Sequence, residues 1–180
     1  DPPDGYASVS MVDIAYLGFD ADQVPELVDL PLEERAPLLA TPLLPFDGLN
    51  ERGLAIGMAA VPPGNVPADA DKQTIGSLGV IRRMLDEAAT ADEALAVMES
   101  YNIDFSGGPP VHYLIADATG RALLVELYQG EVVVTPNHGA WHLATNFLLA
   151  AAEDSPLGHC HRYDRIYRTL VESGGKMNPE

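Results

Sequence analysis

The chain has 180 residues, a hydrophobic content of 47% and a formal net charge of -17 at pH 7. This length and composition predict one domain whose core is large enough to fold without disulfide bonds. The acidic excess repels phosphate backbones and anionic membrane surfaces, so nucleic acid is not an expected partner. No apolar run approaches the roughly 20 residues of a membrane span, and the single cysteine, Cys160, excludes an intramolecular disulfide.

Both ends of the sequence have the look of cut ends. The chain starts at Asp1 without an initiator methionine, and Asn178-Pro179-Glu180 places a helix-capping residue before a proline suited to the first helical position. We therefore expect a single domain over residues 1–180 that is truncated at both ends, with a helix beginning near residue 178.

The first part of the chain predicts strands and short helical turns. Residues 6–19 are rich in β-branched and alternating apolar residues, which indicates a strand that bends into a loop. Prolines divide the next segment, so we expect short helical turns at 25–30 and 32–38 that cover a face of the sheet. Residues 45–62 combine two apolar runs with a polar, glycine-containing turn, which predicts a strand, a turn and a buried strand.

Two helices are expected after the Pro/Gly-rich loop at 62–72. Apolar residues recur at helical spacing from Leu78 to about Ala89. A second helix begins at Thr90, because Thr90-Ala91-Asp92-Glu93 has the pattern of a capping box. The two helices predict a hairpin that packs on a sheet.

From Val111 onward the apolar pattern changes to period two. It predicts four strands, at Val111–Asp117, Arg121–Tyr128, Glu131–Pro136 and Trp141–Asn146, joined by glycine-containing turns into an antiparallel meander. A last amphipathic helix runs from about residue 163 to 171 and ends at Gly174-Gly175. Because helices flank the strands and do not alternate with them, the fold class is α+β with an antiparallel sheet.

The histidines and the cysteine allow several interpretations. His159-Cys160-His161 brings metal-ligand types together, but alternate residues point in different directions and a closed site needs about four ligands. The Cys160 thiol next to two histidines is a candidate nucleophile, or an inert thiol. Gly107-Gly108 leads into a strand and not a helix, so no phosphate cradle follows. We expect neither a cofactor nor a resident metal.

Two polar residues at element ends are candidate site residues. Asn146, at the end of the fourth expected strand, could donate its amide N–H to an oxyanion, or simply cap a turn. Arg162, at the head of the last helix, could hold a carboxylate or orient a catalytic group, or pair with Asp164 at the surface.

Four segments, taken in order, resemble the choloylglycine hydrolase and penicillin acyltransferase group of N-terminal-nucleophile hydrolases, the linear amide C–N hydrolases. Asp47-Gly48-Leu49-Asn50-Glu51-Arg52-Gly53-Leu54 is similar to that family's Asp-Gly-Met-Asn-Glu-Lys-Gly-Leu segment. His112 to Gly120 with Val125-Glu126 is similar to its later hairpin, Thr145-Asn146 to its Thr-Asn strand end, and Arg162-Tyr163-Asp164-Arg165 to its Arg-aromatic-x-Arg helix. Order and spacing agree over about residues 47–170.

The resemblance implies an αββα sandwich and an enzyme that hydrolyses a linear amide or transfers its acyl group. The family's nucleophile is a cysteine that processing makes N-terminal, so that its own α-amino group serves as base. That cysteine would precede Asp1, and Cys160 does not occupy its position. Residues 1–180 alone are therefore expected to be inactive.

The resemblance also implies roles for three residues. Asn146 matches the asparagine whose amide is one oxyanion donor, Arg162 matches an arginine that supports the nucleophile region, and Ala60 matches a position whose backbone N–H is the second donor. Phe147 stands where bile salt hydrolases commonly have Ser-Pro, which disfavours bile salts as substrates and favours an acyltransferase-like or an uncharacterised member of the family. The expected partners are a small-molecule amide and the missing N-terminal segment, with a homo-oligomer left open. A non-catalytic binding domain and a His/Cys metal protein remain alternatives.

Overall fold

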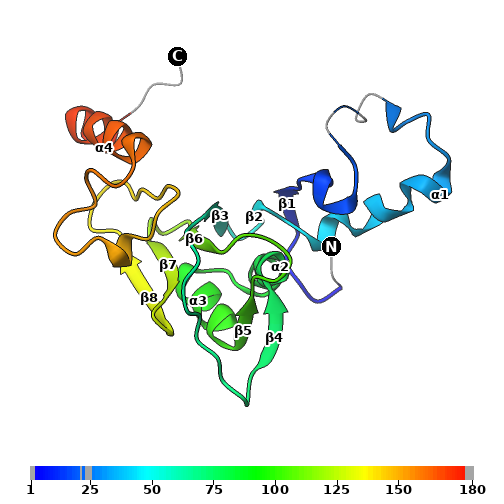
Figure 1. The fold of residues 1–180 in the computed structure, drawn as a ribbon, viewed down its shortest axis with the longest axis horizontal. Helices are drawn as coiled ribbons and strands as arrows, with labels where there is room; N and C mark the ends of the chain where they lie inside the picture. The colour runs from blue at the N-terminus through cyan, green and yellow to red at the C-terminus, as the bar shows by residue number, and fades with distance from the viewer. Residues whose placement is uncertain (1–2, 21, 23–25, 177–180) are drawn as a thin grey trace.

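The computed structural model describes residues 3–20, 22 and 26–176 and shows an α+β fold (Figure 1). Six strands form one sheet in the order β1-β2-β3-β6-β7-β8, and each neighbouring pair is antiparallel. The strands are β1 (Ser8–Met11), β2 (Asp47–Asn50), β3 (Ala55–Ala60), β6 (Val111–Ala116), β7 (Ala122–Tyr128) and β8 (Glu131–Pro136). The predicted class, an antiparallel sheet flanked by helices, is confirmed.

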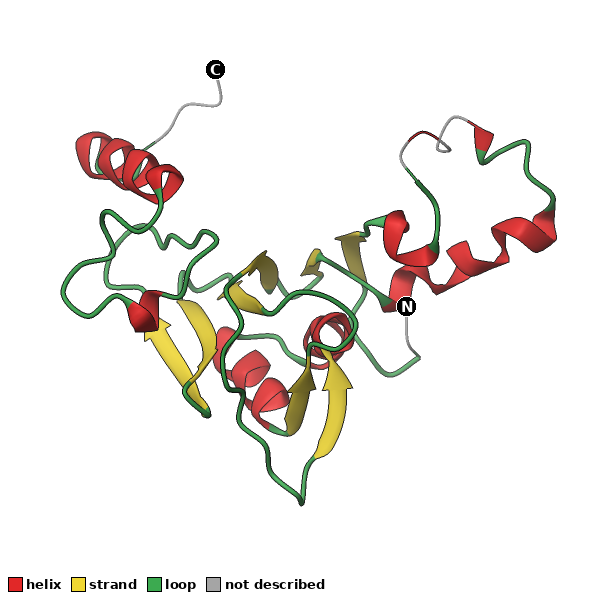
Figure 2. Ribbon diagram, viewed as in Figure 1, coloured by secondary structure: helices red, strands yellow, loops and turns green. Residues whose placement is uncertain are grey.

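A layer of two helices covers one face of this sheet. Helices α2 (Ser77–Glu87) and α3 (Ala91–Glu99) connect β4 (Gln73–Gly76) to β5 (Tyr101–Asp104), and these two strands form a separate parallel pair (Figure 2). The main core lies between the helices and the sheet and includes Ile81, Met84, Leu85, Met98, Tyr113, Ile115, Leu123 and Val125. The described residues hold one large sheet, so the second sheet of the expected sandwich remains an expectation.

A buried asparagine fixes the hairpin between β2 and β3. The side-chain oxygen of Asn50 accepts the backbone N–H groups of Arg52 and Leu54 at 3.0 and 3.1 Å. The side-chain NH2 group of Asn50 donates to the backbone carbonyls of Leu85 and Ala88 at the end of α2. The strand, turn and strand expected over 45–62 are confirmed. The turn follows Asn50, and Asp47-Gly48 lies inside β2 and not in the turn.

The start of α3 is the local feature that the sequence specifies best. The Thr90 hydroxyl accepts the N–H of Glu93 at 3.2 Å, and the Glu93 carboxylate accepts the N–H of Thr90 at 3.2 Å. Both halves of the capping box are therefore present, and they satisfy N–H groups that have no partner within the helix.

The prediction of a fourth meander strand at Trp141–Asn146 is wrong. Residues 141–146 are extended and bury alternate side chains, but they form no strand. The His142 ring takes the place of a backbone ladder to β8, since Nδ1 accepts the N–H of Leu143 and Nε2 donates to the Thr135 carbonyl at 2.8 Å. The segment packs on α4 (His161–Ser173), where Leu143, Phe147, Tyr163 and Leu170 make a second small core.

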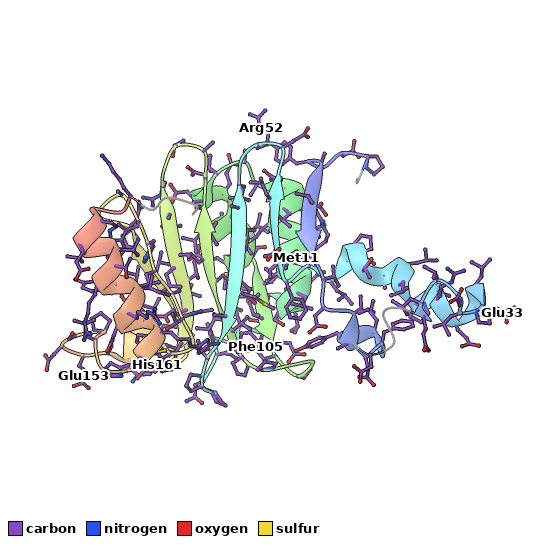
Figure 3. The ribbon with its side chains drawn as sticks, turned by 90° about the horizontal axis from the view of Figure 1, so that it is seen from above. Met11, Glu33, Arg52, Phe105, Glu153 and His161 are labelled. Atoms are coloured by element: carbon purple, nitrogen blue, oxygen red, sulfur yellow. The ribbon has the colours of Figure 1, made fainter. Side chains whose placement is uncertain are left out.

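The prediction that the N-terminal helical turns cover a face of the sheet is wrong. In the structure these segments lie beside the sheet. After β1 come the 3-10 turn η1 (Ile14–Leu17), helix α1 (Leu32–Arg35) and the 3-10 helix η3 (Ala36–Leu43). Figure 3 places Glu33 well beyond the edge strand β1, and Leu32 and Leu39 are 78% and 83% exposed. The turn expected at 25–30 lies partly, and the helix start at 178 wholly, outside the described residues.

The expected last helix is confirmed as α4, which ends where Gly174 adopts a left-handed conformation and donates its N–H to the last-turn carbonyls. Within residues 3–20, 22 and 26–176, no helix combines the length and the apolar character that crossing a membrane requires.

Candidate active site

The structure brings together the three residues that the sequence singled out, Ala60, Asn146 and Arg162. The Asn146 amide nitrogen donates to the Ala60 carbonyl at 2.9 Å, across a sequence separation of 86 residues. A guanidinium N–H of Arg162 donates to the Asn146 carbonyl oxygen at 2.8 Å. Asn146 thus links the end of β3 to the first turn of α4.

These two contacts determine which way the Asn146 amide faces. A guanidinium has only donors, so the side chain must turn its oxygen toward Arg162 and its NH2 group toward β3. The reverse orientation would oppose donor to donor at Arg162 and acceptor to acceptor at Ala60. One amide hydrogen is bonded to the Ala60 carbonyl, and the second is available to a ligand as a donor.

The Ala60 backbone N–H lies on the same side of β3 as its carbonyl. The N–H of Val61 donates to the Pro110 carbonyl, and Ala60 pairs with Val111, so the alternation of an antiparallel ladder turns the Ala60 amide away from β6. On that other side, the pairing of β2 with β3 ends at Gly48 and Ile56. The end of β3 therefore offers an N–H and a carbonyl to a side that β2 leaves open.

A cleft of about 640 Å³ opens at this point, with Ala60 and Asn146 among its lining residues. Most of its wall is apolar and includes Met58 and Val111 of the sheet, Leu78 of α2 and the aromatic pair Tyr16 and Phe46. The two rings meet edge to face with centroids 5.1 Å apart. Asp104 is the one charged residue among the described residues that line the cleft, and no Lys, Arg or His joins it.

Cys160 lies just before α4, close to this group. The nearby Thr145 hydroxyl, and then the backbone N–H groups of Tyr163 and Arg162 at the start of α4, favour the thiolate and lower the pKa of Cys160 to about 7. The thiol therefore has an activated character that residue types alone leave undecided. It belongs to residue 160 of the chain and carries no α-amino group of its own.

The neighbouring histidines do not assemble a metal site in the part of the chain that the structure describes. The His159 ring stacks on Phe147 with centroids 5.4 Å apart and an angle of 6° between the planes. No cluster of three or more His, Cys, Asp or Glu side chains with metal-binding geometry occurs among residues 3–20, 22 and 26–176. The structure thus gives the metal-protein alternative no support.

The sequence carries the profile of a known family over most of its length. Residues 38–148 match the model of the linear amide C-N hydrolases, choloylglycine hydrolase family. The chain belongs to this family. The match includes Ala60 and Asn146, and Arg162 lies beyond it.

Solved structures of two members resemble part of the chain. Penicillin V acylase from Agrobacterium tumefaciens is 26% identical with a TM-score of 0.45, and the alignment covers 54% of this chain and 31% of that one. Conjugated bile acid hydrolase from Clostridium perfringens, seen in two variants, is 24% identical with a TM-score of 0.44, covering 52% and 31%. The chain thus spans under a third of the length of these proteins.

Sequence reasoning missed two features of the site. The first is the wall formed by Tyr16 and Phe46, since nothing in the segments around residues 16 and 46 predicts that their rings meet. The second is the buried pair His112 and Glu126, which is linked to the segment after Asn146 because Glu126 accepts the N–H of Leu149. A signal for this pair was present: each is a polar residue within an otherwise apolar strand, Val-His-Tyr-Leu-Ile and Leu-Leu-Val-Glu-Leu.

Proposed function

We propose that the protein of which these residues are part cleaves linear amides, or transfers their acyl groups, through an acyl-enzyme. The observation that carries the proposal is the Asn146 amide, held between Arg162 and Ala60 at the edge of an apolar cleft. Membership of the linear amide hydrolase family supports the reaction class.

The reaction needs donors where negative charge develops. Attack of a thiolate on the amide carbonyl forms a carbon–sulfur bond and turns the carbonyl oxygen into an oxyanion. The free Asn146 N–H and the backbone N–H of Ala60 are the two donors for that oxyanion, and both are fixed before the substrate binds. Collapse of the intermediate expels the amine, which takes a proton, and water or another amine then releases the acyl group.

The attacking thiolate belongs to a cysteine outside residues 1–180. A cysteine at a processed N-terminus supplies its own amine as the base, and Cys160, inside the chain, has none. The Cys160 thiol also lies against the start of α4, beside the backbone N–H groups of Tyr163 and Arg162. Arg162 acts on the reaction through Asn146, as a positioning residue.

The cleft favours a neutral, apolar acyl group. The described residues that line it make an aromatic and aliphatic wall, and none of them is a cation that could pair with a carboxylate or sulfonate. Asp104 at the cleft and the net charge of -17 add repulsion for anions. Burying an unpaired carboxylate in such a wall is costly, so an acyl group that ends in a carboxylate is a poor substrate.

The test compares hexanoyl and adipoyl p-nitroanilides, which differ by a terminal carboxylate, as substrates of the whole protein. We expect the hexanoyl amide to be cleaved with a kcat/KM at least about tenfold higher, the equivalent of about 1.4 kcal/mol. Mass spectrometry of the mature protein should find cysteine as its first residue, and Cys160→Ser should keep the activity.

Two results would count against the proposal. A mature N-terminus without cysteine, together with no cleavage of either amide, would favour the non-catalytic binding domain. Loss of amide cleavage in Cys160→Ser, with the protein still folded, would move the nucleophile into this chain.

A further inference from the structure

His112 and Glu126 form a hydrogen-bonded pair that is buried in the sheet. They face each other across β6 and β7 on the face opposite the helices, with His112 Nδ1 2.9 Å from Glu126 Oε1. Their side chains are 1% and 0% exposed. A buried pair of this kind is often no more stabilising than apolar residues of similar volume, so stability alone does not account for it.

The Glu126 carboxylate reaches out of the sheet to the segment that follows Asn146. Oε1 also accepts the backbone N–H of Leu149 at 2.8 Å, and Oε2 accepts that of Ala150 at 2.7 Å. These are the first residues of the 3-10 turn η4 (Leu149–Ala151). Glu126 thus receives two backbone N–H groups and the His112 ring, so each oxygen of the buried carboxylate accepts at least one hydrogen bond.

Only two residues separate Asn146 from this anchor, and both are buried. The Phe147 N–H donates to the Thr145 carbonyl, which makes a tight turn at Asn146. Phe147 and Leu148 are 8% and 7% exposed. Displacing the Leu149 amide from Glu126 therefore moves the Asn146 backbone, because the buried residues between them leave little slack.

We infer that His112 and Glu126 are positioning residues for the oxyanion site: they hold residues 146–150 against the sheet, so that the Asn146 amide stays beside Ala60. The inference rests on the proposed function. Arg162 holds the side chain of Asn146, and Glu126 holds the backbone three residues further along, at Leu149.

The role of His112 follows from its two ring nitrogens. Nδ1 faces the carboxylate, which accepts a hydrogen, while Nε2 is buried with no partner among the described residues. The ring therefore connects Glu126 to no further acid or base in this part of the chain. We therefore assign the His112 ring the role of orienting the Glu126 carboxylate, together with the two backbone N–H groups.

A double-mutant cycle in the whole protein tests the inference. The variants are Glu126→Gln, Asn146→Ala and the two combined, with a hexanoyl amide as substrate. The glutamine side chain in Glu126→Gln keeps one acceptor oxygen but points an NH2 group at a backbone N–H, so we expect kcat to fall by about tenfold or more while KM changes less than about threefold. In the Asn146→Ala background, the same change should lower kcat by less than about threefold, because there is no amide left to misplace.

Asn50→Ser is the matched control. Asn50 is also a buried polar residue with four hydrogen bonds to backbone groups, but these tie the β2–β3 turn to α2. This substitution should lower the melting temperature and leave kcat of the folded protein unchanged. Equal kcat losses for Glu126→Gln in the presence and absence of Asn146 would overturn the inference.

A second readout does not depend on turnover. In protein labelled with ¹⁵N-asparagine, the side-chain amide signals of Asn146 are assigned by their loss in Asn146→Ala. Glu126→Gln should shift or broaden them, and Asn50→Ser should not. If the wild-type protein cleaves no amide, the proposed function falls, and these signals alone decide the positioning role: unshifted signals in Glu126→Gln refute it.

Discussion

Replacing Asn146 by aspartate separates the catalytic role of this residue from any structural one. The substitution keeps the shape of the side chain and its contact with Arg162, but exchanges the NH2 group that faces β3 for a second acceptor. The oxyanion loses one donor and meets a negative charge. We expect the whole protein carrying Asn146→Asp to bind and fold normally and to turn over slowly.

The sizes of the two effects differ enough to be told apart. Removing one oxyanion donor costs about 10²–10³ in kcat, or about 2.7–4 kcal/mol. The structural loss is one hydrogen bond to the Ala60 carbonyl, with a net value of about 0.5–1.5 kcal/mol, and the Asn146 side chain is exposed. The new ion pair with Arg162 offsets part of that loss by up to about 1 kcal/mol. The free energy of unfolding should therefore change by less than about 1 kcal/mol.

The assay measures kcat and KM on a p-nitroanilide, and the free energy of unfolding in urea, for wild type and variant. Asn102→Asp is the control, since the Asn102 amide donates to the carbonyls of Asp69 and Lys72 in a surface loop. It should lose stability and keep kcat. A kcat for Asn146→Asp within about threefold of wild type would refute the role of this amide as an oxyanion donor.

Two further predictions concern the surroundings of the site. Gly48→Ala should lower the free energy of unfolding by about 1–3 kcal/mol, because the added Cβ would lie 2.5 Å from the buried Leu85 side chain. The control is Gly57→Ala, whose added Cβ meets nothing within 4 Å. In the same urea titration, Gly57→Ala should be nearly neutral. The rate at which iodoacetamide alkylates Cys160 should rise with pH through an apparent pKa of about 7, since the thiolate is the reactive form. Thr145→Val removes the hydroxyl that stabilises the thiolate and should move that midpoint upward; an unmoved midpoint would contradict the assigned cause.

The sequence predicts local structure well where the determinants are local. The Thr90 capping box needs only residues three apart, and the glycine after α4 marks its end, so both were legible. The prediction of a strand at 141–146 failed because alternating apolar residues show that one side of a segment is buried, but not which element covers that side. Leu143 and Thr145 are indeed buried, but against a helix and a loop. The short parallel strands β4 and β5 left no periodic signal.

The candidate site could be predicted only from the resemblance to the linear amide hydrolase family. Asn146 and Arg162, taken as residue types, each had an ordinary surface interpretation, and Ala60 contributes a backbone group that no residue type reveals. The contact between Asn146 and Ala60 joins residues 86 positions apart, which neither periodicity nor capping can predict. The membership of the family is shown, while the roles of these three residues stay predictions that the variants above test.

The lack of a strand at Asn146 has a consequence for how firmly the two proposed oxyanion donors are held. Ala60 lies at the end of β3, and all six residues of this strand pair with β6, so a continuous ladder holds the backbone that carries the Ala60 N–H. Asn146 has no such ladder: its side chain is held by Arg162, and its backbone is held through its neighbours, by Phe147 in the small core on α4 and by the bond of Leu149 to Glu126. Segments held by few contacts open at lower free energy than paired strands. The Asn146 donor is therefore the more easily displaced of the two, and substitutions among its contacts should lower turnover before they unfold the protein.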